Sequence, residues 1–286
     1  MKKILVTGAN GQLGQCLQKI SSQFEEFEFI FTDSETLDIT NKEEVNDFFW
    51  QNAPDFCINA AAYTAVDLAE TDIEKAFLVN ADGAENLAEA CAENNAQFIH
   101  VSTDYVFDGE NNLAYTEEDF TNPLGVYGAS KLAGDELALE VNPCSVILRT
   151  SWVYSEFGKN FVKTMLNLFA TKEELNIVAD QFGQPTNAND LAEAIMKIIK
   201  SEKITPGIFN FSNLGRISWF DFAEKIAELS DAKIKLNAIE TSQYPTPAKR
   251  PKNSVLDLDK ISKTYAIQLK PWEESIEDCV QILQNN

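Results

Sequence analysis

Tyr127 and Lys131 are the residues best suited to chemistry, because they stand four positions apart in the segment VYGASK. Residues four apart share one face of a helix, so the lysine ammonium can lie beside the phenol. A neighbouring cation lowers the pKa of a tyrosine, which is about 10 when unperturbed. The pair therefore indicates a general acid that protonates a carbonyl oxygen while hydride arrives at the carbon. Since such pairs also occur by chance in helices, this interpretation depends on their surroundings.

Thr103 and Asp104 follow the apolar run of residues 98–102 and form a second candidate group. Ligands of open α/β sheets bind at the carboxyl ends of the strands, where these side chains would stand. We expect the Thr103 hydroxyl to orient a substrate carbonyl toward Tyr127, and Asp104 to contact the substrate as well. His100 is the only histidine of the chain. Because tyrosine supplies the proton, a packed or hydrogen-bonded core histidine is the favoured interpretation.

A glycine-rich turn follows the first apolar run, residues 3–7, and precedes a helical pattern. Such a turn lets the backbone approach a pyrophosphate, while the helix N-terminus offers N–H groups and the positive end of its dipole. This position between a strand and a helix favours a dinucleotide loop over an unliganded turn. The predicted contacts come from Gly8, Asn10, Gly11, Gln12, Leu13 and Gly14.

Two acidic residues follow the second apolar run, residues 27–32. Asp33 stands where an acid can accept hydrogen bonds from the adenosine ribose hydroxyls of NADH and repel a 2′-phosphate. Asp38 and Ile39 match the position that flanks the adenine, although Asp38 could instead cap a helix. The cofactor is therefore expected to be NADH or NADPH, with NADH favoured.

Short apolar runs alternate with amphipathic stretches along the first half of the chain. The runs predict buried strands at residues 3–7, 27–32, 56–60, 98–102 and 145–150. Strands that alternate with helices imply right-handed βαβ units and a parallel sheet covered on both faces. The sequence thus predicts an α/β class protein with a doubly wound parallel sheet of the Rossmann type.

The alternation of apolar runs and amphipathic stretches becomes less regular after residue 151. Helices are expected at residues 161–169, 190–199 and 219–229 and from about residue 272, with a strand at 207–211. We expect a dinucleotide-binding domain over residues 1–150. A smaller α/β domain over residues 151–286 would mainly bind the substrate, with some of its helices returning to pack on the sheet.

The composition excludes several classes of partner. A net charge of −22 makes broad binding to nucleic acid or anionic membranes unfavourable, although a local donor cluster could still hold an anionic ligand. The five cysteines are widely spaced, which argues against a disulfide framework and a zinc site. No stretch is apolar for long enough to serve as a signal peptide or a membrane span, so we expect a cytoplasmic protein.

Together these motifs resemble the extended short-chain dehydrogenase/reductase family. Its GxxGxxG fingerprint and Ser/Thr-Tyr-Lys triad match the glycine turn and Thr103, Tyr127 and Lys131. The segment NAAAYT resembles the family's loop beside the cofactor, which implies contacts from Ala61, Ala62, Tyr63 and Thr64. Related nucleotide-sugar 4,6-dehydratases carry an Asp-Glu pair after the triad threonine. Here Tyr105 follows Asp104, which favours simple reduction over dehydration.

Second-half segments resemble one narrower family, the dTDP-4-dehydrorhamnose reductases. The matching segments are RTSWVY at 149–154, DQFGQPT at 180–186 and YPTPAKRP at 244–251. The resemblance implies reduction of the 4-keto group of a nucleotide-linked sugar. Trp152 would offer an aromatic face to the sugar or base, and Lys249 and Arg250 would bind the diphosphate. A core tryptophan and a solvated basic loop are the alternatives.

Some members of this family form dimers through a metal held by acidic residues, one of them just after the glycine loop. Cys16 stands at that position here, so no metal is expected, and the protein is expected to be a monomer or a homodimer. Two other functions remain open. One is a non-catalytic regulatory subunit on the same fold, which the intact triad disfavours. The other is a reductase or epimerase of another nucleotide sugar.

Overall fold

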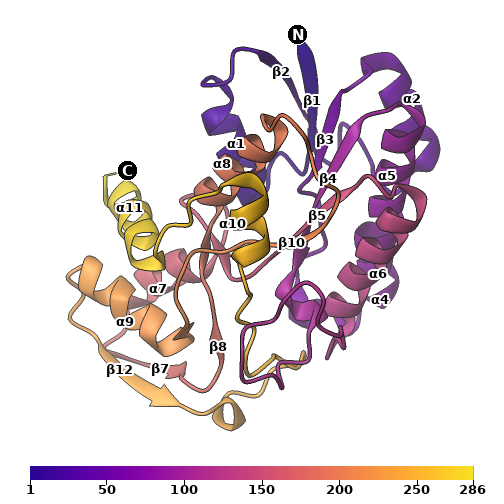
Figure 1. The fold of residues 1–286 in the computed structure, drawn as a ribbon. Helices are drawn as coiled ribbons and strands as arrows, with labels where there is room; N and C mark the ends of the chain where they lie inside the picture. Colours follow the sequence, from indigo (N-terminus) through magenta and orange to yellow (C-terminus); the bar gives the residue numbers. More distant parts are fainter. Residues whose placement is uncertain (286) are drawn as a thin grey trace.

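A six-stranded sheet forms the centre of the molecule. The computed structural model describes residues 1–285 and orders the strands β10-β5-β4-β3-β1-β2 (Figure 1). Every neighbouring pair is parallel. The strands are β1 (Lys2–Thr7), β2 (Phe27–Phe31), β3 (Phe56–Asn59), β4 (Gln97–Thr103), β5 (Val146–Thr150) and β10 (Gly207–Asn210).

Helices cover both faces of this sheet, as Figure 1 shows. One face carries α2 (Lys42–Asn52), α5 (Gly83–Glu93) and α6 (Val126–Val141), and the other carries α1 (Gln12–Ser21), α8 (Ala188–Ile199) and α10 (Asp259–Tyr265). Successive side chains of a strand point to opposite faces. Ile4 and Val6 accordingly pack beneath α1 and α8, whereas Leu5 packs beneath α2 and α5. The apolar strand runs are therefore buried on both sides, which is typical of parallel sheets.

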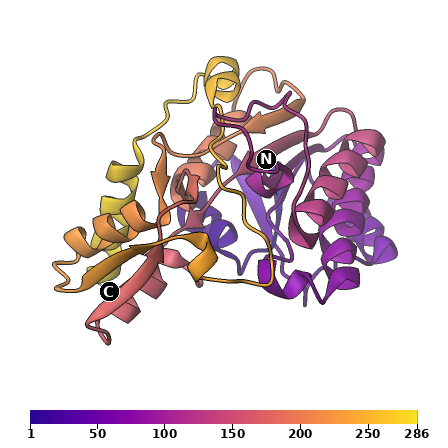
Figure 2. The same cartoon turned by 90° about the horizontal axis from the view of Figure 1, so that it is seen from below.

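A smaller layer lies beside the carboxyl ends of the strands (Figure 2). It consists of α7 (Phe161–Phe169), α9 (Trp219–Leu229), α11 (Trp272–Gln284) and the paired strands β7 (Glu174–Val178) and β12 (Lys235–Ile239). Phe222 and Ile276 lie at the centre of its own apolar core. Short pairs join the parts: β6 (Val153–Tyr154) with β9 (Thr186–Asn187), and β8 (Phe182–Gly183) with β11 (Ile217–Ser218).

The predicted doubly wound fold is confirmed, and each expected strand and helix is found within a few residues of its predicted bounds. The β7–β12 pair was not predicted, because its partly exposed strands carry little apolar signal. The sheet itself takes β10, α8 and α10 from beyond residue 151, so the proposed division at residue 150 stays a prediction. Within residues 1–285, no helix is both long and apolar enough to cross a membrane.

Truncating the fully buried Ile195 of α8 to alanine is expected to lower the free energy of unfolding by about 2–5 kcal/mol, because it leaves a cavity between α8 and the sheet. Urea denaturation measures the loss. Glu193→Ala, on the exposed face of the same helix, serves as the control and is expected to change stability by less than about 0.5 kcal/mol. Equal losses in the two variants would contradict this packing.

Candidate active site

A cavity of about 1070 Å³ opens at the carboxyl ends of the strands, between the sheet and the smaller layer. Most of the residues predicted from the sequence line it. They are Gly8, Asn10, Gly11, Gln12, Leu13, Asp33, Asp38, Ile39, Ala61, Ala62, Thr64, Thr103, Asp104, Tyr127, Lys131 and Trp152. Four predicted contacts, Gly14, Tyr63, Lys249 and Arg250, do not line this cavity.

The glycine turn is shaped by close backbone contacts. Gly8 adopts a left-handed conformation with a φ of +68°, and a Cβ there would lie 2.7 Å from the Ala60 carbonyl carbon. At Gly14 a Cβ would lie 2.4 Å from the Gly8 carbonyl oxygen, so only glycine fits here, and its predicted cofactor contact stays a prediction. Helix α1 begins at Gln12 with no side-chain cap. Its first N–H groups are therefore available to a phosphate.

Asp33 is held in place at the far end of the cavity. Its carboxylate accepts hydrogen bonds from the Asn10 side-chain amide at 2.6 Å and from the Thr36 hydroxyl at 2.9 Å. The Thr36 hydroxyl is the largest influence that lowers the pKa of Asp33, so this carboxyl is ionised at neutral pH. Asp38 accepts from Thr40 and does not cap α2, whose N-cap residue is Asn41.

The loop after β3 presents Ala61, Ala62 and Thr64 to the cavity, but Tyr63 is turned away. The phenol of Tyr63 donates to Asp72, and its backbone N–H and C=O both bond the side chain of Asn80. Asn80 is buried in the irregular helical segment η1 (Leu78–Asp82). The Asn80 amide thus orients the loop, and the predicted cofactor contact of Tyr63 stays a prediction. No local sequence pattern indicated this role of Asn80.

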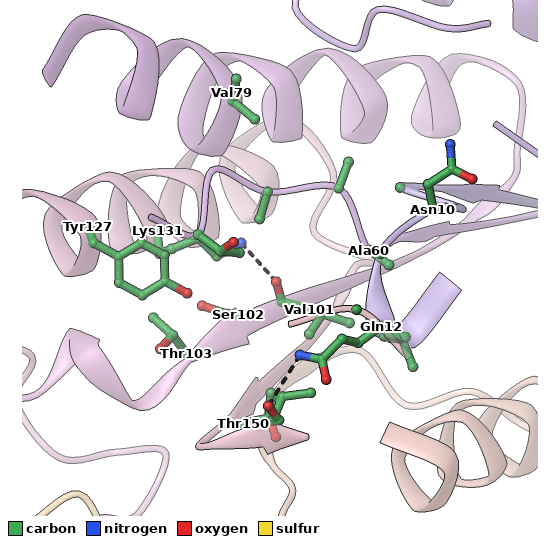
Figure 3. A pocket seen from close by; sticks show the side chains of 18 of the residues that line it. Asn10, Gln12, Ala60, Val79, Val101, Ser102, Thr103, Tyr127, Lys131 and Thr150 are labelled. Carbon is green, nitrogen blue, oxygen red and sulfur yellow. Dashed lines mark hydrogen bonds between the residues drawn. The ribbon is translucent and has the colours of Figure 1, made fainter. Parts of the chain in front are cut away.

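Tyr127 and Lys131 occupy one face near the start of α6, and Figure 3 shows the phenol oxygen pointing toward Thr103. The Glu70 carboxylate accepts the Val126 N–H at 2.9 Å and caps this helix, since the N-cap residue Gly125 has no side chain. Glu70 lies 56 positions before Val126, so no local sequence pattern indicated this cap. Thr103 is the last residue of β4, and its hydroxyl donates to Asp104 at 3.0 Å.

The expectation that Lys131 lowers the pKa of Tyr127 is corrected by the structure. Burial raises the pKa of Tyr127 to about 12, and the hydrogen bond with Thr103 opposes this only in part. The Lys131 ammonium donates to the Val101 carbonyl at 2.8 Å, drawn in Figure 3 as the dashed line between Lys131 and Val101, and lies 3.0 Å from His100 Nε2. The phenol is thus protonated at neutral pH, as a general acid must be.

Burial acts on the neighbouring ionisable groups as well. It lowers the pKa of Lys131 to about 8, against the attraction of Asp135. It raises the pKa of the buried Asp104 carboxyl to about 6, against hydrogen bonds with Ser254 and Thr103. His100 is fully buried and hydrogen-bonded, which confirms the predicted core histidine. Such shifts of several neighbouring groups are typical of catalytic sites.

Two stacked tryptophans border the cavity on the side of the smaller layer. Trp152 and Trp219 are parallel, with ring centroids 3.5 Å apart, and both line the cavity. Trp152 has a φ of +47°, and a Cβ on Gly183 would lie 2.6 Å from its ring. This pair can stack on a sugar or base. Trp219 was missed because it opens α9, far from the other motifs in sequence.

The two residues of the basic pair, Lys249 and Arg250, have different surroundings. Arg250 forms a 2.8 Å ion pair with Asp67 and also bonds Thr246 and the Ala248 carbonyl. It thereby fixes the Pro-rich loop against the segment after β3. Lys249 is exposed. The expected diphosphate contact of these two residues stays a prediction.

Cys16, at the position after the glycine loop, is buried in the structure. Burial, together with the nearby Glu156, raises the pKa of its thiol to about 12. The expectation that no metal is bound stays a prediction. No group of three or more His, Cys, Asp or Glu side chains in the described part of the chain is placed to hold a metal ion.

The fold and the triad define an oxidoreductase of the extended short-chain dehydrogenase/reductase type. The family described as the RmlD substrate binding domain matches residues 1–285. A dTDP-4-dehydrorhamnose reductase from Aggregatibacter actinomycetemcomitans is 44% identical over 97% of this chain and 98% of its own length. The chain belongs to this family of dTDP-4-dehydrorhamnose reductases.

Solved structures agree with this assignment. A dTDP-4-dehydrorhamnose reductase from Clostridium acetobutylicum shares 43% identity and a TM-score of 0.94, with 99% of both chains covered. One from Bacillus anthracis, solved in complex with NADP, shares 38% identity and a TM-score of 0.95 over 99% of this chain and all of its own. DesIV, a dTDP-glucose 4,6-dehydratase from Streptomyces venezuelae, is 16% identical and shares the fold alone, with a TM-score of 0.84 over 99% of this chain and 97% of its own.

The environment of Asp33 leads to a prediction about the cofactor. Asp33→Ala is expected to weaken NADH binding by roughly tenfold, because the hydrogen bonds to the ribose are lost. NADPH is expected to lose less, because the same change removes repulsion of the 2′-phosphate. Fluorescence titration of each cofactor measures both effects. Glu35→Ala, which removes a neighbouring charge from the cavity edge, is the control, and equal losses of NADH and NADPH in Asp33→Ala would contradict the ribose contact.

Proposed function

We propose that this protein reduces the 4-keto group of dTDP-4-dehydro-L-rhamnose to give dTDP-L-rhamnose. The observation that carries the proposal is the convergence of Thr103, Tyr127 and Lys131 on a cavity that begins at a dinucleotide turn. Family membership supports the substrate. NADH or NADPH would bind from the glycine turn toward Lys131 and supply hydride when bound. NADH is favoured by the ionised Asp33.

Thr103, Tyr127 and Lys131 orient the substrate, supply the proton and would hold the cofactor. The Thr103 hydroxyl orients the keto oxygen, and the protonated phenol of Tyr127 gives its proton to that oxygen as charge develops there. The Lys131 ammonium lines the same cavity and would hold the nicotinamide ribose when the cofactor is bound. Thr103 and Lys131 are buried, and removal from water strengthens their electrostatic interactions.

Reduction is favoured over elimination of water by the residues after Thr103. Asp104 is followed by Tyr105, whose ring packs edge-on against Tyr127 with centroids 5.6 Å apart. No second carboxylate from this segment reaches the site to complete the acid and base pair of a dehydratase. Asp104 and the stacked Trp152 and Trp219 would bind the sugar and the base.

We further infer a cytoplasmic enzyme that acts as a monomer or a homodimer. All five cysteines in the described part of the chain are unpaired, and Cys16, Cys57, Cys91 and Cys279 are buried. Unpaired buried thiols are typical of a reducing compartment. Cell fractionation and light scattering test these two inferences.

The assay that tests the function follows absorbance of NADH or NADPH in the presence of dTDP-4-dehydro-L-rhamnose. We expect oxidation of cofactor that depends on substrate. Properly folded protein that oxidises neither cofactor would defeat the proposal, as expected for a regulatory subunit. Turnover of other nucleotide-linked keto-sugars with higher kcat/KM would indicate a different reductase.

Tyr127→Phe is expected to lower kcat by about 10²-fold or more, because the proton donor is lost. Cofactor binding, measured by fluorescence, is expected to change little. Tyr265→Phe is the control, since this phenol of α10 bonds the Thr205 carbonyl, away from the cavity. Unchanged turnover of Tyr127→Phe would remove Tyr127 as the acid.

A further inference from the structure

A row of polar side chains crosses the sheet directly beneath Lys131. The strand register aligns Thr7 of β1 with Asn59 of β3, and Asn59 with His100 of β4. All three are nearly or fully buried, and Lys131 above them is only 1% exposed. The proposed mechanism assigns no role to Asn59 or His100.

We propose that His100 is a positioning residue that donates its Nε2–H to the uncharged amine of Lys131 and so weakens the hold of this lysine on its proton. The effect on catalysis rests on the function proposed above. The hydrogen-bond arrangement rests on the contacts of the buried row alone.

A backbone N–H group determines which way the Asn59 amide is oriented, and with it the direction of the hydrogen bonds along the row. The Ala61 N–H is a donor, and it lies 3.2 Å from the side-chain oxygen of Asn59, which also accepts from the Thr7 hydroxyl at 2.7 Å. The amide nitrogen of Asn59 therefore faces His100, 3.0 Å from Nδ1. Because an amide nitrogen only donates, Nδ1 must accept.

The tautomer of the histidine follows from this contact. A neutral imidazole carries one proton, so a bare Nδ1 places the hydrogen on Nε2. Nε2 lies 3.0 Å from Lys131 Nζ. An uncharged amine can accept that hydrogen and still donate to the Val101 carbonyl at 2.8 Å. An ammonium can only donate, so it opposes Nε2–H unless His100 changes tautomer and opposes Asn59 instead.

The other charged groups around the contact between His100 and Lys131 do not remove the conflict between Nε2–H and a lysine ammonium, which are both donors. Asp135 of α6 lies 3.9 Å from His100 Nε2, beyond hydrogen-bond distance, and is paired with Arg149 of β5 at 3.2 Å. Tyr127, also of α6, and Asp104, after β4, line the same cavity as Lys131. Burial holds the pKa of His100 well below its usual value, with a contribution from Lys131, so the imidazole is neutral.

Nuclear magnetic resonance tests the tautomer without any substitution, since His100 is the only histidine. Protein labelled with ¹⁵N-histidine is expected to show protonated Nε2 and bare Nδ1 in alkaline solution. The ring signals are expected to change as Lys131 gains its proton, with a midpoint near its pKa of about 8. Protonated Nδ1 in alkaline solution, or signals that stay constant from about pH 6 to about pH 10, would overturn the proposal.

The Asn59→Asp substitution reverses the direction of the hydrogen bonds along the row, and it hardly changes the shape of the side chain. One carboxylate oxygen can still accept from Ala61 and Thr7, and the other accepts from Nδ1–H, which leaves Nε2 bare toward an ammonium. The alkaline limb of the kcat/KM profile, measured with saturating cofactor, is expected to move upward by about one pH unit.

The carboxylate that Asn59→Asp introduces also raises the pKa of Lys131 through space, so the same substitution is made in a His100→Phe background. In that background the upward shift of the alkaline limb is expected to be smaller, because no imidazole connects residue 59 with Lys131 by hydrogen bonds. Equal shifts in both backgrounds, or a downward shift with His100 present, would overturn the proposal. Protein that never oxidises NADH or NADPH defeats the proposed function instead, and the resonance experiment still decides the tautomer.

Discussion

The parallel register of β1, β3, β4 and β5 is the constraint on which the rest of the structure depends. It aligns Thr7 with Asn59, Asn59 with His100, and Thr103 with Thr150. Since parallel strands end at one edge of the sheet, the glycine turn, the loop after β3 and Thr103 all open into the same cavity. A shift of one strand by a single residue would turn its side chains to the opposite face and separate these groups.

Burial is the main influence on the proton affinities in this site. It raises the pKa of Tyr127, lowers that of Lys131 and keeps His100 neutral. Each shift disfavours the charged form of the group, as removal from water does. At neutral pH Tyr127 and His100 are therefore uncharged, while Lys131 still carries its proton. This arrangement suits the reduction of a neutral carbonyl.

The smaller layer is tied to the cofactor turn by side-chain hydrogen bonds. Gln12 accepts from Ser155 and Asn160 and donates to the Val153 carbonyl. The same layer supplies Trp152 and Trp219 to the cavity. The position of the smaller layer relative to the glycine turn thus depends on contacts between residues more than 140 positions apart.

The sequence by itself determined the doubly wound fold, the phosphate turn and the triad, because each rests on local signals: apolar periodicity, glycines between a strand and a helix, and a spacing of four within a helix. It did not predict Asn80, Glu70, Trp219 or the side-chain direction of Tyr63, and it misjudged the pKa of Tyr127. Those features depend on which distant segments pack together and on how much water they exclude. Only the tertiary structure decided them, since burial and hydrogen-bond partners are set by contacts that no local pattern records.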